Sequence, residues 1–479
     1  MYNDFKSTAY QKAGDYNLSS FINLIPYTYD VDGADLQRIN IHGLVQEISI
    51  FESIDKNVIT GNVVIVDASN VFGEIPITGL ERLEFTIATP GVSKFYDFTV
   101  ESGEPVFVHK IEKQEELSAN TKGFILHFCS MERVRNQSRL FSRAYHNNHE
   151  LIVQDILRTQ LQSKKTFIFE PSKSMHKHVF PAVNPLSAIN YLANDTQSKA
   201  HNGAGYKFYE TSSGFHFQSI ESMTNLSSGA PRPNIAEYTI KRKGVRGGGD
   251  RNIESDLQSI EKLEVTKRTD TLLNFDTGVY ASEMVTHNQF TKQFTTQNFN
   301  YLGNRLSVSQ METDKSGEVL LGQGIIPNAF IEGNKTPADM VGRRYFKSTT
   351  TKLHNNASLP PKEKIDQKRV SKNVALMNTE VKISVPGFFG VGAGDVVGVE
   401  IPAYQNTSLG TTDSISGKYL VCECRQLIRK DLTSHTTHLT LRKDAFKRVL
   451  ADENFDTFTQ QRAEKNNVDY SIAVIDESQ

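Results

Sequence analysis

The sequence predicts an α+β protein that is mainly β, with two separated antiparallel β-domains of barrel or sandwich type, a mixed α/β domain between them and an inserted subdomain. Short runs of alternating apolar and polar residues fill two separated parts of the chain, residues 37–130 and 374–443. Such alternation is typical of strands with one buried face, and closely spaced runs favour antiparallel barrels or sandwiches. Between these parts the apolar residues take helical spacing. The length of 479 residues also favours several domains over one core.

These changes of pattern divide the chain into six expected parts. They are a flexible N-terminal arm (1–20), a first antiparallel β-domain (21–130), a mixed α/β middle domain with a long basic loop (131–256), a second antiparallel β-domain (257–300 and 373–445), an inserted subdomain (301–372), and a C-terminal helix with a polar tail (446–479).

The first β-region contains the clearest alternation, at residues 83–88, where Leu83, Phe85 and Ile87 are predicted to point inward. Similar runs occur at 45–51, 62–66, 97–100 and 123–128. Turn residues such as Pro90-Gly91 separate them, as expected for short links between strands.

The middle part changes to a mixed α/β pattern. Residues 149–161 place four apolar side chains on one helical face, and a second helix is predicted to begin at Asn184-Pro185, an N-cap followed by proline. Residues 166–170 and 205–220 are aromatic and strand-like. Alternation returns at Val381–Val385, and then in two further runs, 397–401 and 437–441. The two β-regions resemble each other in spacing, which suggests an internal duplication.

Composition limits the possible partners. The chain has 53 basic and 55 acidic residues and a formal net charge of -2, so no general attraction to nucleic acid or anionic membranes is expected. The basic stretch 241–251 is interpreted as a solvated loop or a protein contact. Three cysteines argue for a reducing cytoplasm during folding, and no signal peptide or membrane span is predicted.

One group of residues has the composition of a metal site. Cys422 and Cys424, with His435 and His438, offer four zinc ligands. The two cysteines share a strand face, but His435 and His438 are separated by an odd number of residues and should point to opposite faces. Two small buried cysteines and two surface or pairing histidines are therefore the favoured interpretation, and no metal or cofactor is predicted.

Two further histidine pairs, His146 with His149 and His176 with His178, lie among polar residues. No cysteine or carboxylate cluster stands next to them in the sequence, so all four are predicted to be exposed.

No catalytic site is predicted. The glycine-rich run Gly390–Gly394 precedes a strand, whereas a phosphate-binding loop needs a following helix N-terminus. No nucleophile elbow, HExxH helix or carboxylate pair in an aromatic groove is found, and the chain has no tryptophan. A cell-wall-degrading enzyme is kept as an alternative hypothesis from a different class of protein.

Three sets of motifs resemble the central baseplate hub proteins of contractile-tailed, T-even-like phages. The first is 50–54 (IFESI), 60–67 (TGNVVIVD) and 75–79 (IPITG); the second is 184–193 (NPLSAINYLA), 205–210 (GYKFYE) and 214–217 (GFHF). The third is 394–397 (GDVV), 417–421 (GKYLV) and 439–444 (LTLRKD), which is similar to late control protein D and the N-terminal part of VgrG. The resemblance spans roughly residues 37–445.

The resemblance implies that both β-domains are tube-like antiparallel β-barrels. It also implies a non-enzymatic virion protein of the tail baseplate, assembled in the bacterial cytoplasm. Three chains would present six similar β-domains in a ring, as an adaptor between the tail tube and the central spike, with a lumen for the genome. The implied partners are further copies of the chain, a trimeric spike protein on a separate polypeptide, tube or tube-initiator proteins, the tape measure protein, baseplate wedge proteins and, transiently, phage DNA, with no stable membrane binding. The alternative within the same class is a hexameric tube initiator or distal tail ring protein.

Overall fold

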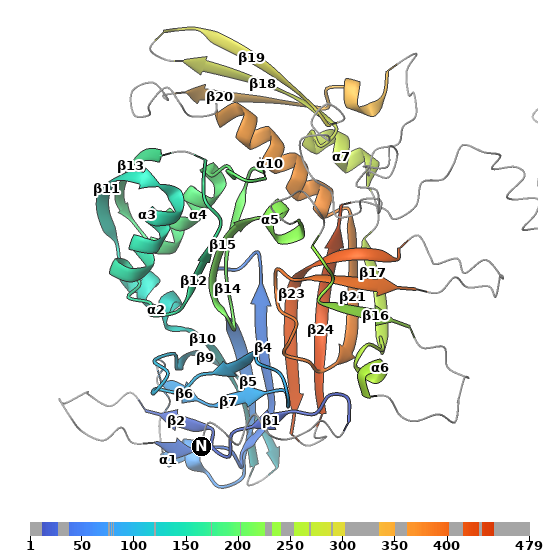
Figure 1. Cartoon of the computed structure of the whole chain (residues 1–479). Helices are drawn as coiled ribbons and strands as arrows, with labels where there is room; N and C mark the ends of the chain where they lie inside the picture. The colour runs from blue at the N-terminus through green and yellow to red at the C-terminus, as the bar shows by residue number, and fades with distance from the viewer. Residues whose placement is uncertain are drawn as a thin grey trace, which may run out of the picture.

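The computed structural model confirms the predicted fold class: the chain is α+β and mainly β. Figure 1 shows two β-regions side by side, a mixed α/β domain beside them and a small subdomain at the far end. The structure describes residues 12–26, 38–74, 77, 79, 81–118, 121–173, 175–201, 203–225, 232–240, 253–267, 270–288, 291–301, 335–349, 362–401, 415–430 and 434–444.

The first β-region is a curved antiparallel sheet in the order β4-β5-β10-β9-β6-β2-β3, with a small β1-β7-β8 sheet beside it. Its elements are β1 (Asn17–Leu18), β2 (Asn23–Ile25), β3 (Ile39–Asn40), β4 (Val45–Ser53), β5 (Thr60–Asp67), α1 (Val71–Glu74), β6 (Arg82–Glu84), β7 (Thr86–Ala88), β8 (Phe95–Asp97), β9 (Val106–Ser118) and β10 (Thr121–Ser130). Inward residues such as Val63, Ile65 and Phe128 are fully buried in one core. The predicted run 83–87 is correctly inward, but it is divided between β6 and β7, which belong to different sheets.

The predicted flexible arm differs from the structure over its described part. Residues Asn17 and Leu18 form β1, which pairs with β7, and Leu18 packs against the core of the first β-region. The partner strand β7 lies about 70 residues farther along the chain, so the polar composition of residues 1–20 did not indicate this pairing. Residues 1–11 lie outside the described residues.

The middle domain confirms the predicted mixture of helices and strands. Its elements are α2 (Met131–Ser138), β11 (Phe141–Asn148), α3 (His149–Asp155), the π-helical turn η2 (Ile156–Gln160), β12 (Phe167–Phe169), β13 (Met175–Val183), α4 (Pro185–Asp195), β14 (Tyr206–Thr211), β15 (Gly214–Ser219) and α5 (Ile220–Thr224). Helix α4 begins at Pro185, as predicted. The Asn184 amide does not cap it; instead it donates to the carbonyls of Asn136 and Arg139.

The second β-region forms a barrel. Its elements are β16 (Ala236–Thr239), α6 (Ile253–Leu257), β17 (Lys262–Lys267), β21 (Thr379–Pro386), β22 (Val396–Glu400), β23 (Gly417–Arg429) and β24 (Ser434–Lys443). The pairing order is β17-β21-β24-β23-β22-β16, and a parallel bridge between Thr239 and Ser259, just before β17, closes the ring. Apolar residues of five of these strands share one buried core.

Antiparallel pairing of β4 with β23 joins the two β-regions into one continuous sheet. The register runs from Ser53 opposite Glu423 to Glu47 opposite Arg429. We call this pairing the seam. Because a seam of backbone hydrogen bonds fixes both register and distance, the two β-regions are held side by side.

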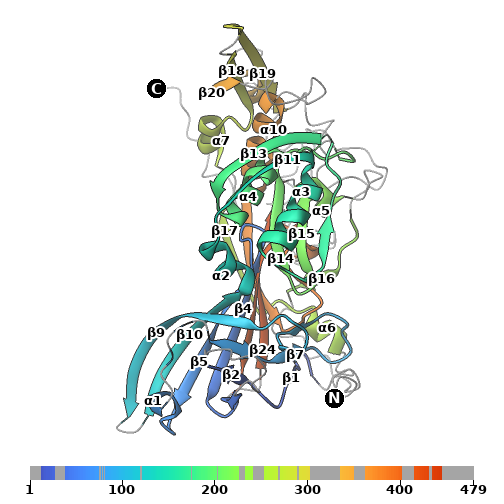
Figure 2. The ribbon, with the colours of Figure 1, turned by 90° about the vertical axis from the view of Figure 1, so that its left-hand side faces the viewer.

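The remaining elements form an upper subdomain, visible at the top of Figure 2. They are α7 (Thr271–Thr277), β18 (Ala281–Asn288), β19 (Phe294–Asn300), the 3-10 turn η3 (Pro337–Asp339), β20 (Arg343–Thr349) and α10 (Lys362–Leu376). Among the described residues, no helix combines the length and apolar character needed to cross a membrane.

Two stretches belong to different regions of the fold from those predicted for them. Residues 281–300, predicted in the second barrel, pair with β20 in a separate three-stranded sheet. Conversely β16, predicted in the middle domain, pairs with β22 of the second barrel. Alternation identifies a strand but not its partner, which explains both differences. The C-terminal helix predicted at 446–450 lies outside the described residues.

Candidate functional site at the junction of the three regions

The carboxylate of Glu52, on β4, lies where the two β-regions and the middle domain meet. Its Oε1 accepts hydrogen bonds from the Tyr96 hydroxyl at 2.7 Å and from the Ser212 amide at 2.8 Å. Its Oε2 accepts from the Ala393 amide at 3.1 Å. Glu52 is 2% exposed, and burial raises its pKa, against the lowering effect of these donors. One side chain thus connects the first β-region, the β14–β15 turn and the second β-region.

The glycine-rich run Gly390–Gly394 supplies part of this junction. The Gly392 amide donates to Asp395, and the Ala393 amide donates to Glu52. Gly394 has φ +88°, and a Cβ there would lie 2.1 Å from the Tyr209 hydroxyl oxygen, so glycine is required at this position. The amides of the run therefore bind carboxylates of the same chain, and the run leads into β22, as the sequence predicts.

A second buried cluster joins the middle domain to the first β-region. The Lys165 Nζ lies 2.5 Å from Glu210 Oε1 and 3.2 Å from Glu132 Oε2. Glu210 Oε2 accepts from the Ser130 hydroxyl at 2.7 Å and from the Ile59 amide at 2.9 Å. Burial acts to lower the pKa of Lys165, but the two carboxylates raise it. Lys165 is therefore charged, and the cluster is a hydrogen-bonded ion triad.

A third contact, more exposed, links the middle domain to the second β-region through Asp55. Its carboxylate lies 2.7 Å from Lys207 Nζ on β14 and 3.1 Å from Arg442 on β24. Burial alone would raise the pKa of Asp55, but these two cations lower it. All three junction contacts place paired or hydrogen-bonded charges between regions, an arrangement that fixes their relative positions.

The structure does not bring Cys422, Cys424, His435 and His438, which have the composition of a zinc site, together into one site. Cys422 is the extra residue of a bulge in β23 and packs in a different cluster from Cys424. His435 is buried, whereas His438 is half-buried and bonds Ser384, so the two histidines point to opposite faces as predicted. The amide of Gln426 lies between Cys424 and His435, 3.3 Å from the sulfur and 2.8 Å from the imidazole Nε2.

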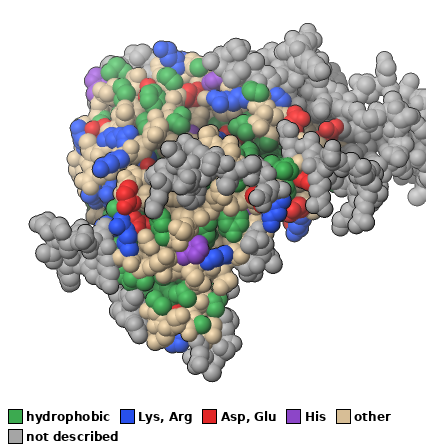
Figure 3. Space-filling model, turned by 60° about the horizontal axis from the view of Figure 1, so that its bottom comes forward, with side chains coloured by type: hydrophobic (Ala, Val, Ile, Leu, Met, Phe, Trp, Pro, Cys, Tyr) green, Lys and Arg blue, Asp and Glu red, His purple; other side chains and the backbone are tan. Residues whose placement is uncertain are grey.

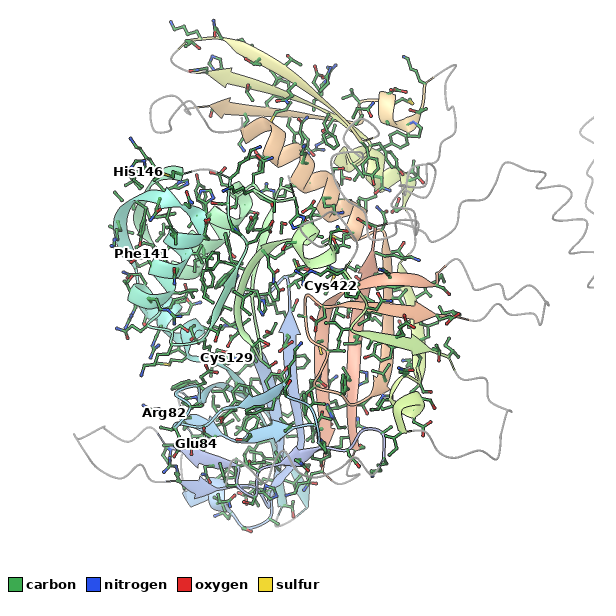
Figure 4. The ribbon with its side chains drawn as sticks, in the orientation of Figure 1. Arg82, Glu84, Cys129, Phe141, His146 and Cys422 are labelled. Atoms are coloured by element: carbon green, nitrogen blue, oxygen red, sulfur yellow. The ribbon has the colours of Figure 1, made fainter. Side chains whose placement is uncertain are left out.

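All three cysteines are free and buried, and burial raises their pKa, to about 11 for Cys129 and about 12 for Cys422. A raised thiol pKa disfavours the thiolate that binds metals. Figure 4 shows Cys129 at the boundary of the first β-region and Cys422 near the top of β23.

Acidification is expected to reduce stability through His435. Burial lowers its pKa to about 3 from an ordinary 6.5, and the ring stacks on Phe389 at 4.4 Å. Because the unfolded chain binds a proton at His435 at a higher pH than the folded protein does, acid favours the unfolded state. The free energy of unfolding is therefore not reduced by this effect above pH 6.5, and it decreases as pH falls from 6.5 toward 3. Relative to the non-titrating His435→Phe, the free energy of unfolding should fall by up to about 1.4 kcal/mol per pH unit in that range.

Urea unfolding at several pH values measures this difference. His146→Phe is the matched control, because it makes the same replacement at a histidine that is exposed on β11. Equal slopes for the wild type and His435→Phe would contradict the expectation.

The prediction that all four paired histidines are exposed is wrong for two of them. His149 is fully buried and His178 is 9% exposed, and their rings face each other. His146 is exposed, as predicted, at the outer edge of the middle domain in Figure 4. Pairing of β11 with β13 and packing of α3 against α4 bring His149 and His178 together. The basic stretch 241–251 lies outside the described residues.

Glu52, Lys165 and Glu210 were not predicted from the sequence. For Glu52 a signal exists, because Ile48, Ile50 and Glu52 occupy alternate positions of one run and therefore share its inward face. An acidic residue at an inward position needs buried donors. Lys165 and Glu210 have no such local signal, since they are 45 residues apart.

No protein-family model and no curated protein matches the chain. Among solved structures, the tail protein from Neisseria meningitidis MC58 is similar, with 12% identity, a TM-score of 0.49, and coverage of 90% of this chain and 97% of its own. The 43 kDa tail protein of prophage MuSo2 from Shewanella oneidensis has 8% identity, a TM-score of 0.46, and coverage of 89% and 99%.

A third similar structure is an Escherichia coli protein described as a component of the type VI secretion system. It has 7% identity and a TM-score of 0.41, and the match covers 89% of this chain and 76% of that protein. Identities this low, with TM-scores below 0.5, establish neither a family nor a function for this chain.

Proposed function

We propose that this chain is a structural subunit of the central baseplate hub of a contractile phage tail. In this proposal three copies form a ring of six similar β-regions, which adapts a six-fold tail tube to a three-fold spike and encloses a lumen for the genome. The observation that carries the proposal is the seam, which joins two β-regions of one chain side by side in a single sheet.

Two β-regions per chain are what a three-fold to six-fold adaptor requires. Each has its own apolar core, one including Ile50 and Phe128, the other including Val397 and Leu441. Closed rings built from repeated heterologous contacts are a common route to symmetric assemblies. A ring of three chains would then contain three seams within chains and three equivalent contacts between chains.

Rigid attachment between the two β-regions supports the same role. Phe389, which follows β21, is buried in the core of the first β-region, and its amide donates to Thr89. Lys94 lies 3.3 Å from Asp395 and donates to the Gly390 carbonyl at 3.2 Å. Together with Glu52, these contacts oppose hinge motion at the seam. An adaptor needs this rigidity, because the angle between neighbouring β-regions sets the number of subunits in the ring.

The charge balance of the chain is consistent with protein partners rather than DNA binding. Figure 3 shows basic and acidic side chains interspersed over the visible face. DNA passage through a lumen, without stable binding, agrees with a net charge of -2. We propose the spike, the tube or tube-initiator proteins, the tape measure protein and baseplate wedge proteins as partners, with the virion tail as the final location and the host cytoplasm as the place of assembly.

Mass measurement tests this proposal. Light scattering and native mass spectrometry of the purified full-length chain, alone and with the spike protein, should give three chains per particle. A chain that stays monomeric with the spike would contradict the hub, and six chains per particle would favour a tube initiator instead. Clearing of peptidoglycan in a zymogram would favour the enzyme hypothesis.

A further inference from the structure

The middle domain brings together three potential metal ligands that are distant in the sequence. His149 is the first residue of α3, His178 lies in β13, and Asp195 is the last residue of α4. The two imidazole Nε2 atoms are 3.2 Å apart, and the Asp195 Oδ2 lies 3.9 Å from the His178 Nε2. All three ligand atoms lie within 4.8 Å of one another. We propose that these residues form a binding site for a divalent transition metal ion of the zinc type.

The hydrogen bonds around His149 fix which of its nitrogens carries the proton. The Thr196 hydroxyl donates to the Leu192 carbonyl at 2.6 Å, so its oxygen accepts from the other side. His149 Nδ1 lies 2.7 Å from that oxygen and therefore donates its proton to it. The neutral ring then has its lone pair on Nε2, which faces His178. Metal-bound histidines in proteins are commonly oriented in the same way, by donating the N–H of the other ring nitrogen to an acceptor.

The distances suit a metal of this size. Zinc binds imidazole nitrogen at about 2.0–2.1 Å in tetrahedral geometry, which places two nitrogen ligands about 3.3 Å apart. The observed separation of 3.2 Å between the Nε2 atoms is close to this value. The Asp195 carboxylate oxygen is somewhat farther out and would move inward to complete a three-ligand set. Two imidazoles and one carboxylate suit zinc, and also cobalt, nickel or copper, better than magnesium or calcium.

The surroundings hold the two rings in place and leave access from one side. The His178 ring stacks on that of Phe180 in the same strand, with centroids 5.8 Å apart, and meets the Tyr191 ring of α4 edge-on at 5.5 Å. The Asp195 side chain is 12% exposed and Tyr191 is 49% exposed, whereas His149 is fully buried. A metal would therefore enter past Asp195 and Tyr191, and a water molecule would complete its coordination. Binding would tie α3, β13 and α4 together.

Direct titration of the full-length chain with cobalt chloride, followed by zinc competition, tests the proposal. Cobalt in a tetrahedral nitrogen and oxygen site gives intense visible absorption, which should saturate at one ion per chain and disappear when zinc is added. The melting temperature should rise with zinc concentration, because an ion that binds only the folded state stabilises it by mass action. A wild-type chain without saturable cobalt absorption would overturn the proposal, whatever the variants do.

Variants separate a metal site from a simple hydrogen bond between the two histidines. His149→Ala and His178→Ala should abolish the cobalt spectrum, and Asp195→Asn should weaken binding. Thr196→Val keeps all three ligands and should weaken metal affinity by about 10–100-fold through loss of the orienting hydrogen bond. His146→Ala, at the exposed end of the same domain, is the matched control and should bind cobalt as the wild type does.

Far-UV circular dichroism checks that each variant folds. A folded His149→Ala or His178→Ala variant that retains wild-type cobalt affinity would contradict the assignment. The test does not depend on the proposed tail function, since ring formation and metal binding are measured separately.

Discussion

Replacing Lys165 by methionine is expected to lower the free energy of unfolding by about 3–5 kcal/mol, because breaking a buried ion cluster leaves uncompensated charge in the interior. Lys165 is the cation between Glu132 and Glu210, and all three side chains are less than 10% exposed. Without the ammonium group, two carboxylates would face each other in a buried site. Burial already raises the pKa of Glu210, so part of the cost would be relieved by protonation.

Thermal melting followed by circular dichroism measures this effect. Lys164→Met is the matched control, because the neighbouring Lys164 is exposed and its replacement should change stability by less than about 0.5 kcal/mol. Melting temperatures that are equal for the two variants would show that the triad contributes little to stability. Because the triad joins the middle domain to the first β-region, Lys165→Met should also loosen the middle domain under conditions in which the second β-region is still folded.

Glu52→Ala is expected to be the other strongly destabilising change. It removes the acceptor of Tyr96, Ser212 and Ala393, and each buried donor left without a partner costs about 1–3 kcal/mol. Water entering the cavity would recover part of this cost, so we expect a net loss of about 3 kcal/mol. Amide hydrogen exchange should increase at Ser212 and Ala393, which lie in the regions that Glu52 joins.

Two comparison variants show whether this effect belongs to the junction. Glu52→Gln keeps one acceptor oxygen for Tyr96 and Ser212, so its loss should be smaller than that of Glu52→Ala. Glu47→Ala removes a partly exposed carboxylate from the same strand, where Glu47 pairs with Arg425 and Arg429 across the seam. Exposed pairs contribute about 0–1 kcal/mol, so a larger loss from Glu47→Ala than from Glu52→Ala would contradict our account of the junction.

Local sequence patterns predicted individual elements well. Alternation around Val63 and Ile65, and around Val381 and Ile383, correctly indicated strands with one buried face. The Asn184-Pro185 signal placed the start of α4 at the correct residue. These features depend on period and local backbone restriction, which the sequence displays directly.

Long-range partners were not predictable in the same way. Glu52 meets Ser212 and Ala393, 160 and 341 residues farther along the chain, and no local pattern encodes these contacts. His149 and His178 were predicted to be exposed because their sequence neighbours are polar, yet β11–β13 pairing buries them. Strand β18 shows the alternation of a barrel strand but pairs with β19 and β20. In each case tertiary pairing, not local composition, decides burial and partner.

Electron microscopy of the ring formed by the full-length chain with its spike is the most direct test of the proposed hub. The account predicts three copies around a hollow axis, each contributing its two β-regions, so that β4–β23 seams within chains alternate with contacts between chains at near six-fold spacing. A ring of six copies in which each chain contributes one β-region, or particles that contain a single copy, would contradict it.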